Sequence, residues 1–547
     1  MSQAATRSEL APPTRLVPVL SARWALGIRH LGVTAGFGLF FLYLNYLPLA
    51  ATDVWGHVAY GKAILSRGAL PSQDMVMPLA EGMPVVDTAW LAQVVLAAVE
   101  SLGGAEALSV LFAVVVLATH LILTRVFYLQ TGDLVLSAFG TALVVAVGWS
   151  RLSTIRPEIF GLFCFATLLL LLARREARET DARSPCQDEP TGRRWHLWIG
   201  VPVLFATWVN LHGSFVCGWA VLGSYLLGRM VEVGWKSRRL SAVLADRDVR
   251  RRLVLVELAV LATLMNPYGA DLLIYTARFS QHSNLRQVME WAPMTIPGVG
   301  GLEFALSWVL LLVVLRHSRA RVRAHHVFLL GVFAALAVSS IRMMSWYAPI
   351  VVVILMPHLR DLAQRVPRFA NRIAAGGRRT DRKWHYSLAC VLMVWITFSF
   401  SSLSRPLLGG PLRTEAQLYA NQTPRGATRH LRDNPPPGPI FNPQWWGDWL
   451  GWDGPPGLQV FVTTNIHLVP SHVWNDYLLI SNAEPGWEKA LQRYRISTVV
   501  VDRQNQPLLA EVLRAAEGWS LRYDDESALI YSREATPHDH NGTVHGT

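Results

Sequence analysis

Long apolar stretches alternate with short polar segments over residues 31–403. About eleven of them are long and apolar enough to predict membrane-spanning helices. They cover residues 31–50, 105–127, 133–150, 158–173, 196–209, 214–230, 253–268, 302–316, 325–341, 345–358 and 385–402. The pattern predicts an α-helical polytopic membrane protein.

The composition agrees, since the chain of 547 residues is 52% apolar and only 16% charged. Its formal net charge of +12 could by itself indicate a nucleic-acid partner. The basic excess, however, lies in short loops beside the apolar stretches, where it orients the spans and contacts anionic headgroups. We therefore expect membrane lipids as partners and no nucleic acid.

Loops rich in Arg and Lys alternate with loops that hold almost none, and the positive-inside rule places the basic ones in the cytoplasm. They are the N-terminus with Arg7, Arg15, Arg23 and Arg29, and residues 174–194, 236–252, 316–323 and 360–383. An odd number of spans then puts the chain from residue 404 onward outside. We expect a multi-pass protein of the inner (plasma) membrane with a cytoplasmic N-terminus.

The pattern divides the chain into four parts: a cytoplasmic leader (1–30), a transmembrane domain (31–403), an extracytoplasmic domain (404–535) and a disordered tail (536–547). The third part is rich in Pro, Asp and Asn. Strand-like runs occur at 458–463, 496–501 and 528–531, with helical pieces at 487–494 and 507–516. This part is predicted to be a small α/β domain.

The first outer loop, residues 51–104, is the other long segment outside the predicted spans. It begins with an amphipathic stretch in which Val54, Val58 and Leu65 can share a face, and Gly68 ends that stretch. We expect this helix to lie flat on the membrane surface. A second short helix follows Asp87 and ends at Gly103 and Gly104.

Candidate catalytic groups occur in this loop. Asp53 and His57 are four residues apart at a helix start, so their side chains can meet as a general base and its orienting partner. The alternative is that Asp53 is an N-cap and His57 an interfacial polar residue. Asp87 is a second candidate carboxylate, although turn residues are often Asp.

Two arginines lie at the outer membrane boundary, against the side preference of the rest of the chain. Arg156 precedes a predicted span, and Arg342 lies between two spans that almost touch. A phosphate partner would account for both, and ion pairs with Glu158, Glu290 or a lipid headgroup are the alternative.

Further polar residues fall in short outer turns. Asn210 and His212 lie in one such turn, near Ser214, and Glu290 and Trp291 could supply an acid and a stacking ring. Carboxylates, arginines, a histidine and aromatic rings on one face suit a ligand with a phosphate, a polar ring and a lipid tail. No P-loop or dinucleotide fingerprint occurs, so a lipid-linked sugar is the expected activated substrate.

The sequence resembles the GT-C superfamily of integral-membrane glycosyltransferases, and most closely its loosely characterised bacterial members. The residues that carry the resemblance are Asp53-Val-Trp-Gly-His57, Asp87-Thr-Ala-Trp90, Arg156-Pro157, Asn210-Leu-His-Gly213, Asn266-Pro267 and, in the outer tail, 441–450 and 473–477. The resemblance implies an inverting enzyme of the hexosyltransferase type. It would move a sugar from a polyprenyl-phosphate donor to a glycan, lipid or protein acceptor outside the cell membrane.

By the same resemblance Asp53 is the catalytic base, with Asp87 as the second candidate, and the donor phosphate is held by Arg156, His212 and Arg342. Asn210, Glu290, Trp90 and Trp291 would bind the substrate. Metal dependence varies in the superfamily, and Asp53, Asp74, Asp87 and Glu290 could together bind one Mg²⁺ or Mn²⁺.

Two other functions fit the pattern. A transporter or flippase would place ionisable groups near the bilayer midplane, and here His120 and Glu257 are the ones within predicted spans. An O-antigen ligase or polymerase would also use a lipid-linked donor, but would rely on Arg and His without a catalytic carboxylate.

Overall fold

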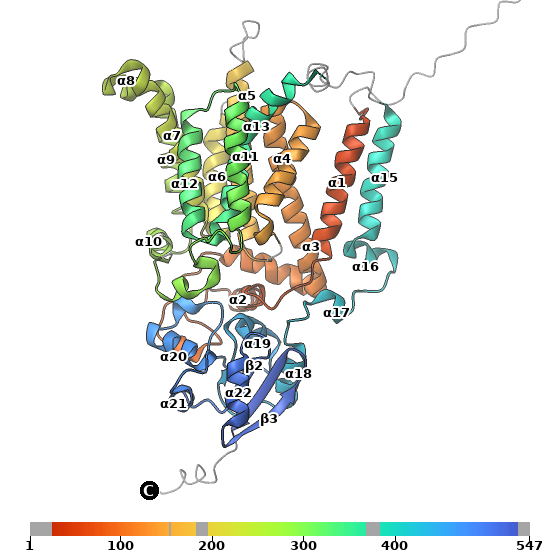
Figure 1. Cartoon of the computed structure of the whole chain (residues 1–547), viewed down its shortest axis with the longest axis vertical. Coiled ribbons are helices and arrows are strands. Elements are labelled where there is room, and N and C mark those ends of the chain that lie inside the picture. The colour runs from red at the N-terminus through yellow and green to blue at the C-terminus, as the bar shows by residue number, and fades with distance from the viewer. Residues whose placement is uncertain (1–23, 153–154, 182–194, 280, 368–382, 534–547) are drawn as a thin grey trace, which may run out of the picture.

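The computed structural model describes residues 24–152, 155–181, 195–279, 281–367 and 383–533. A bundle of long helices forms one end of the molecule, and a smaller domain of short helices and strands forms the other (Figure 1). The expected leader residues 1–23 and the tail 536–547 lie outside the described residues.

Each predicted span coincides with a helix of the bundle. These helices are α1 (Ile28–Asn45), α3 (Trp90–Thr131), α4 (Leu134–Val147), α5 (Glu158–Asp181), α6 (Trp195–Leu211), α7 (Phe215–Ser237), α9 (Arg247–Ala262), α11 (Gly301–His317), α12 (Ala324–Ser339), α13 (Met344–Arg365) and α15 (Trp384–Phe400). By length and apolar composition, 3 helices in the described chain can cross a membrane, or up to 4 if a bent pair counts as one span. The chain is thus a helical membrane protein, while the number of eleven crossings stays a prediction.

The second short helix of the first outer loop joins the span that follows it. The backbone leaves helical geometry at Gly103 and Gly104, where Gly104 has a φ of 62°, so α3 bends sharply there. Its first part runs across the end of the bundle, and its second part enters the bundle (Figure 1). The two glycines therefore end one helix, as predicted, and begin another.

Helix α2 (Val54–Arg67) lies between this first part of α3 and the smaller domain (Figure 1). On the predicted apolar face of α2, protein covers Val54 and Val58, while Leu65 is 53% exposed. The position of α2 flat on the membrane surface stays a prediction. At Gly61 a Cβ would lie 2.1 Å from the Gln93 carbonyl oxygen, and only glycine permits this close approach.

The smaller domain is built on a four-stranded sheet with strand order β1-β2-β4-β3. Strand β1 (Ile440–Phe441) runs parallel to β2 (Thr498–Asp502), and β4 (Ala528–Arg533) is antiparallel to both β2 and β3 (Trp519–Asp524). Its helices are α17 (Glu415–Leu418), α18 (Arg425–Asp433), α19 (Gly447–Asp453), α20 (Ser471–Ser481), α21 (Trp487–Arg493) and α22 (Pro507–Ala515). The predicted run at 458–463 is not a strand, since only a bridge between Val460 and Ile440 forms there.

This domain packs directly on the first outer loop. The Trp55 ring of α2 contacts Trp449 and Trp452 of the domain, with ring centroids 5.0 and 4.4 Å apart. The Asn284 amide donates hydrogen bonds of 2.9 Å to the carbonyls of Ile466 and Val469. One continuous apolar core therefore extends from α2 into the smaller domain.

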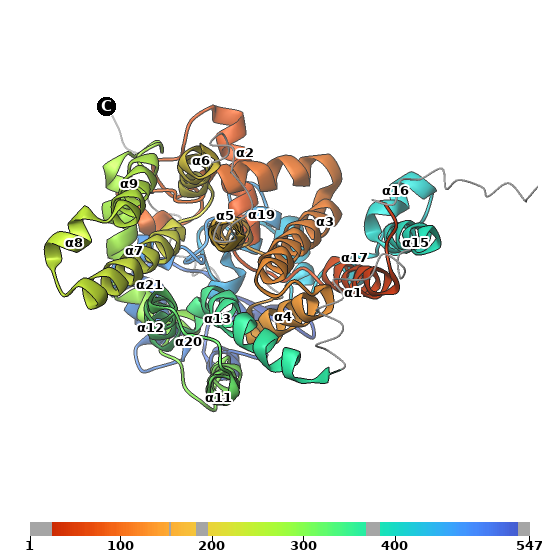
Figure 2. The same cartoon turned by 90° about the horizontal axis from the view of Figure 1, so that it is seen from above.

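Helix α15, which precedes this domain, lies apart from the main bundle (Figure 2). It packs along α1, and at one end the Lys383 amide donates a 2.9 Å hydrogen bond to the Leu26 carbonyl. At the other end Asn45 donates to the Ser402 hydroxyl at 3.0 Å. The pair α1 and α15 thus forms a flank of the molecule.

Candidate active site

Charged side chains meet at the end of the bundle that faces the smaller domain. They come from segments far apart in the sequence: the start of α2, the 3₁₀ turn η2 (Trp149–Arg151), the start of α5, and the turns η5 (Met289–Trp291) and η6 (Ile341–Met343). The last two are tied together, since Ser340 Oγ donates to the Glu290 carbonyl at 3.0 Å and the Ile341 amide donates to the Ala292 carbonyl at 3.2 Å. We call Asp53, Arg151, Arg156, Glu158, Glu290 and Arg342 the charged cluster.

Asp53 occupies the N-cap position of α2, but its side chain makes no capping hydrogen bond. Instead its Oδ1 lies 3.1 Å from Arg156 Nε. The two atoms form an ion pair without hydrogen-bond geometry, because neither has a hydrogen-bond partner. Capping therefore does not explain Asp53, and the carboxylate faces the cluster with one oxygen available for a further bond.

Arg156 bridges two carboxylates. Its Nη1 donates to Glu290 Oε2 at 2.5 Å, on the side opposite the contact with Asp53. Burial disfavours the charge on Arg156, but Asp53 and Glu290 outweigh it and raise its pKa. Burial likewise opposes the charge on Glu290, and Arg156 overcomes it, lowering the pKa of Glu290 to about 2. Of the two explanations for Arg156, ion pairing is observed, and phosphate contact stays a prediction.

Arg342 is held far more loosely than Arg156. Its Nε lies 3.7 Å from Glu158 Oε2, and its guanidinium stands 5.2 Å from the centre of the Trp291 ring. Its side chain is 21% exposed. Neither contact is a hydrogen bond, so most of the five N–H donors of Arg342 have no partner at bonding distance within the described residues. A ligand could use these donors.

Arg151 also belongs to the charged cluster, although it was not among the predicted site residues. It lies 3.5 Å from Glu158 and 3.7 Å from Glu290. The signal that pointed to Arg156, an arginine at the outer end of an apolar stretch, applies to Arg151 as well and would have found it. Three arginines thus face three carboxylates in this cluster.

Asp87 and His57 lie beside the cluster and share one partner. Gln93 donates from Nε2 to Asp87 Oδ1 at 3.1 Å and lies 3.1 Å from His57 Nδ1. No hydrogen bond between Asp53 and His57 is found in the described residues, so His57 does not orient Asp53 directly. Burial raises the pKa of Asp87 to about 6, against hydrogen bonds from Ala89 and Gln93, and burial lowers the pKa of His57. Nothing in the sequence indicated Gln93.

His212 lies near Glu158 and Arg342, whose charges act on it. Burial first and the positive charge of Arg342 second lower its pKa to about 3, so the ring is neutral. The Ser214 amide donates to Nδ1 at 3.2 Å, which makes Nδ1 the acceptor and places the proton on Nε2. His212 can therefore donate a hydrogen bond to an anion without carrying a charge.

Trp90 and Asn210 contact each other rather than the charged cluster. Trp90 Nε1 donates to Asn210 Oδ1 at 2.8 Å, while the Asn210 amide donates to the carbonyls of Ala206 and Met265 at 2.7 and 2.9 Å. These bonds tie the end of α6 to neighbouring segments and use every polar group of the Asn210 side chain. Substrate binding by this pair stays a prediction.

Asp448 of the smaller domain also reaches this region. Its Oδ2 accepts hydrogen bonds from the Thr464 amide and hydroxyl at 3.0 and 2.6 Å, and a Cβ on Gly56 would lie 2.0 Å from its Oδ1. Burial raises the pKa of Asp448 to about 7, and the carboxylates of Asp53 and Asp74 add to the effect. The sequence offered no sign that residue 448 would lie against residue 56.

The four carboxylates considered for Mg²⁺ or Mn²⁺ do not share a site. Asp74 accepts hydrogen bonds from the Tyr60 hydroxyl at 2.6 Å and from two backbone amides, and Asp87 is bound to Ala89 and Gln93. Among the residues described, no three His, Cys, Asp or Glu side chains are placed to hold a metal ion. The geometry gives no support to a metal site built from these residues.

Comparison with known proteins identifies the fold. No family model matches the chain, and no curated protein sequence matches it. The oligosaccharyltransferase AglB of Archaeoglobus fulgidus, solved with an inhibitory peptide and a dolichol-phosphate, superposes with a TM-score of 0.54 over 92% of this chain and 74% of its own, at 12% identity. An oligosaccharyltransferase of Archaeoglobus fulgidus, tethered to an acceptor peptide with an NVT sequon, superposes with a TM-score of 0.53 at the same coverage and identity.

A third structure, ArnT of Cupriavidus metallidurans bound to undecaprenyl phosphate, covers 93% of this chain and 98% of its own at 13% identity. Its TM-score is 0.49. The likeness to AglB shows that this chain has a GT-C-like fold, as the sequence resemblance implied.

Proposed function

We propose that the protein is a membrane glycosyltransferase that moves a sugar from a polyprenyl-phosphate donor to an acceptor at the face that bears the smaller domain. The observation that carries the proposal is the ion pair of Asp53 with Arg156. This ion pair holds the Asp53 carboxylate away from a capping position and in the cluster that contains the loosely held Arg342. A base beside an available phosphate-binding cation is what sugar transfer from a lipid phosphate requires.

In this proposal Asp53 is the general base. It takes the proton of the acceptor hydroxyl or amine as that group attacks the anomeric carbon, the bond from this carbon to the phosphate oxygen breaks, and the configuration inverts. Arg156 acts as a positioning residue, since its ion pairs with Asp53 and Glu290 fix the direction of the carboxylate.

The departing lipid phosphate gains negative charge, which Arg342 and His212 would stabilise. Arg342 offers a permanent charge and several free donors, and neutral His212 offers its Nε2 proton. Trp291, which lies under the Arg342 guanidinium, would stack against the sugar or the donor. The oligosaccharyltransferase of the same fold has been solved with a dolichol-phosphate and with peptides, which supports a lipid phosphate as one ligand.

The test offers purified full-length protein a panel of polyprenyl-phosphate sugars and measures donor consumption in the presence of glycan, lipid and peptide acceptors. Asp53→Asn should lower turnover by about 10²- to 10⁴-fold while donor binding is retained, because a general base contributes about that much. Asp476→Asn is the matched control: this carboxylate bonds Arg493 and Tyr494 in the smaller domain, away from the cluster.

Three outcomes would oppose the proposal. Full turnover of Asp53→Asn, with loss of activity only on replacing Arg342, would indicate an O-antigen ligase type of enzyme. Movement of lipid or solute across the membrane without donor consumption would indicate a transporter. An equal loss in Asp53→Asn and Asp476→Asn would show that the effect is on folding.

A further inference from the structure

A long groove runs along the flank of the molecule, between α1, the second part of α3, the start of α4 and α15. Its volume is about 1020 Å³, and its walls are mostly apolar. It does not include any member of the charged cluster. On α1 its lining extends from Ile28 to Phe41, a span of about 20 Å at the rise of an α-helix.

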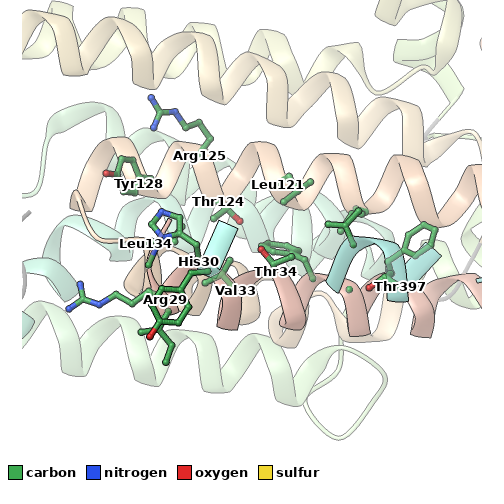
Figure 3. A pocket seen from close by; sticks show the side chains of 18 of the residues that line it. Arg29, His30, Val33, Thr34, Leu121, Thr124, Arg125, Tyr128, Leu134 and Thr397 are labelled. Carbon is green, nitrogen blue, oxygen red and sulfur yellow. Dashed lines mark hydrogen bonds between the residues drawn. The ribbon is translucent and has the colours of Figure 1, made fainter. Parts of the chain in front are cut away.

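Basic side chains gather at one end of this groove. Arg29, His30, Arg125 and Tyr128 lie towards the same end, and Thr397 lies well along the groove from them (Figure 3). Lys383 lines the groove as well. The basic end is the one remote from the candidate active site, because α1 begins there and runs towards the smaller domain (Figure 1).

The protein neutralises only part of the charge at this end. Arg29 lies 3.7 Å from Asp133, but within the described ranges no carboxylate lies at ion-pair distance from Arg125 or Lys383. The Arg125 guanidinium instead stands 5.3 Å from the centre of the Tyr128 ring. An anion with a phosphate group would supply the missing negative charge.

From these observations we propose that the groove binds one acidic phospholipid, with its phosphate at Arg29, Arg125 and Lys383 and an acyl chain along α1. The length fits, because one leaflet of the hydrocarbon core measures about half of 30 Å. The walls fit as well, since Val33, Phe37 and Leu121 are apolar. This site is separate from sugar transfer and does not depend on it.

Bound lipid would join α15 to the rest of the molecule. Helix α15 lies outside the main bundle and packs along α1, and an acyl chain between α15, α1 and α3 would fill the space that the three helices leave (Figure 2). The expected consequence is that phosphatidylglycerol stabilises the purified protein and phosphatidylcholine does so much less.

The test is native mass spectrometry of the full-length protein released from detergent, with phosphatidylglycerol, phosphatidylcholine or polyprenyl phosphate added. One phosphatidylglycerol should be retained at a concentration about tenfold lower than phosphatidylcholine, and the double variant Arg125→Gln, Lys383→Gln should lose about tenfold in affinity. Val394→Trp should abolish retention because Val394 lines the groove. Val391→Trp is its matched control, since Val391 lies on the same helix outside the groove and is similarly exposed, 66% against 59%.

The proposal is overturned if phosphatidylcholine is retained as well as phosphatidylglycerol, or if the double variant and Val394→Trp bind like the unchanged protein. Preferential retention of polyprenyl phosphate, lost in Val394→Trp, would also overturn it and would assign the groove to the donor lipid. Thermal unfolding of each variant without added lipid distinguishes lost binding from lost folding.

Discussion

The charged cluster and the groove on the flank of the bundle both contain arginines, but they differ in how far carboxylates match the positive charge. At the end that faces the smaller domain, Arg151, Arg156 and Arg342 are matched by Asp53, Glu158 and Glu290. In the groove on the flank, Arg29 lies 3.7 Å from Asp133, whereas Arg125 and Lys383 have no carboxylate at ion-pair distance in the described chain. A neutralised cluster holds its groups in fixed positions, whereas cations without partners attract an anion from outside.

The largest expected difference between the two regions is in stability. Arg156→Gln leaves the mostly buried Asp53 without its partner and leaves Glu290 with Arg151 at 3.7 Å, so it should lower the free energy of unfolding by about 3 kcal/mol. Arg125→Gln leaves no carboxylate behind and should change it by less than about 0.5 kcal/mol in lipid-free detergent. Thermal unfolding of both variants measures the contrast, and equal losses would show that the cluster and the groove do not differ in this way.

Replacing Arg342 tests whether the charged cluster contains a cation that can still bind an anion. Arg342→Gln should weaken donor binding by about ten- to a hundredfold, because a hydrogen bond to a charged group contributes about 1.5–3 kcal/mol. The melting temperature of this variant should change little, since the ion pair of Arg342 with Glu158 is as long as 3.7 Å. Arg286→Gln, at an exposed position on the same face, is the control, and an equal effect there would mean that Arg342 acts only through the general charge of the surface.

Asp448 gives an effect that depends on pH. Burial raises the pKa of Asp448 to about 7 from an ordinary value of 3.8. Between these two values the folded state holds a proton that the unfolded chain has released, so stability should fall as pH rises, by up to about 1.4 kcal/mol per pH unit. Asp448→Asn should flatten this part of the profile and raise the melting temperature at pH 8. Thermal unfolding from pH 4 to pH 8 measures the effect, and an unchanged slope would contradict it.

The local pattern of apolar residues was sufficient to predict the helices. Every predicted apolar stretch coincides with a helix, and Gly103 and Gly104 end a helix where expected, because apolar runs and helix-ending glycines act over a few residues. Local pattern failed where another element covers the segment. Residues 458–463 do not form a strand: only Val460 bridges to Ile440, and the Val460 amide donates a 3.0 Å hydrogen bond to the Val76 carbonyl of the first outer loop.

The candidate site was predicted in part. The side preference of Arg and Lys pointed to Arg156 and Arg342, and the structure brings both next to carboxylates. The partners could not be assigned in advance: Asp53 was expected with His57 and is paired with Arg156, and His57 is bonded to Gln93. Sequence spacing limits which side chains on one helix can meet, but it says nothing of contacts between helices.

The sequence by itself determined which segments are apolar helices and where charged residues interrupt them, because both depend on the chemistry of neighbouring residues. Tertiary structure alone decided which charges meet. Residues 53, 156, 290 and 342 come together only when α2, α5 and the turns η5 and η6 pack at one end of the bundle, and Asp448 reaches Gly56 only when the smaller domain docks on α2. Ion pairs act over a few ångströms, so their partners are set by packing and not by distance along the chain.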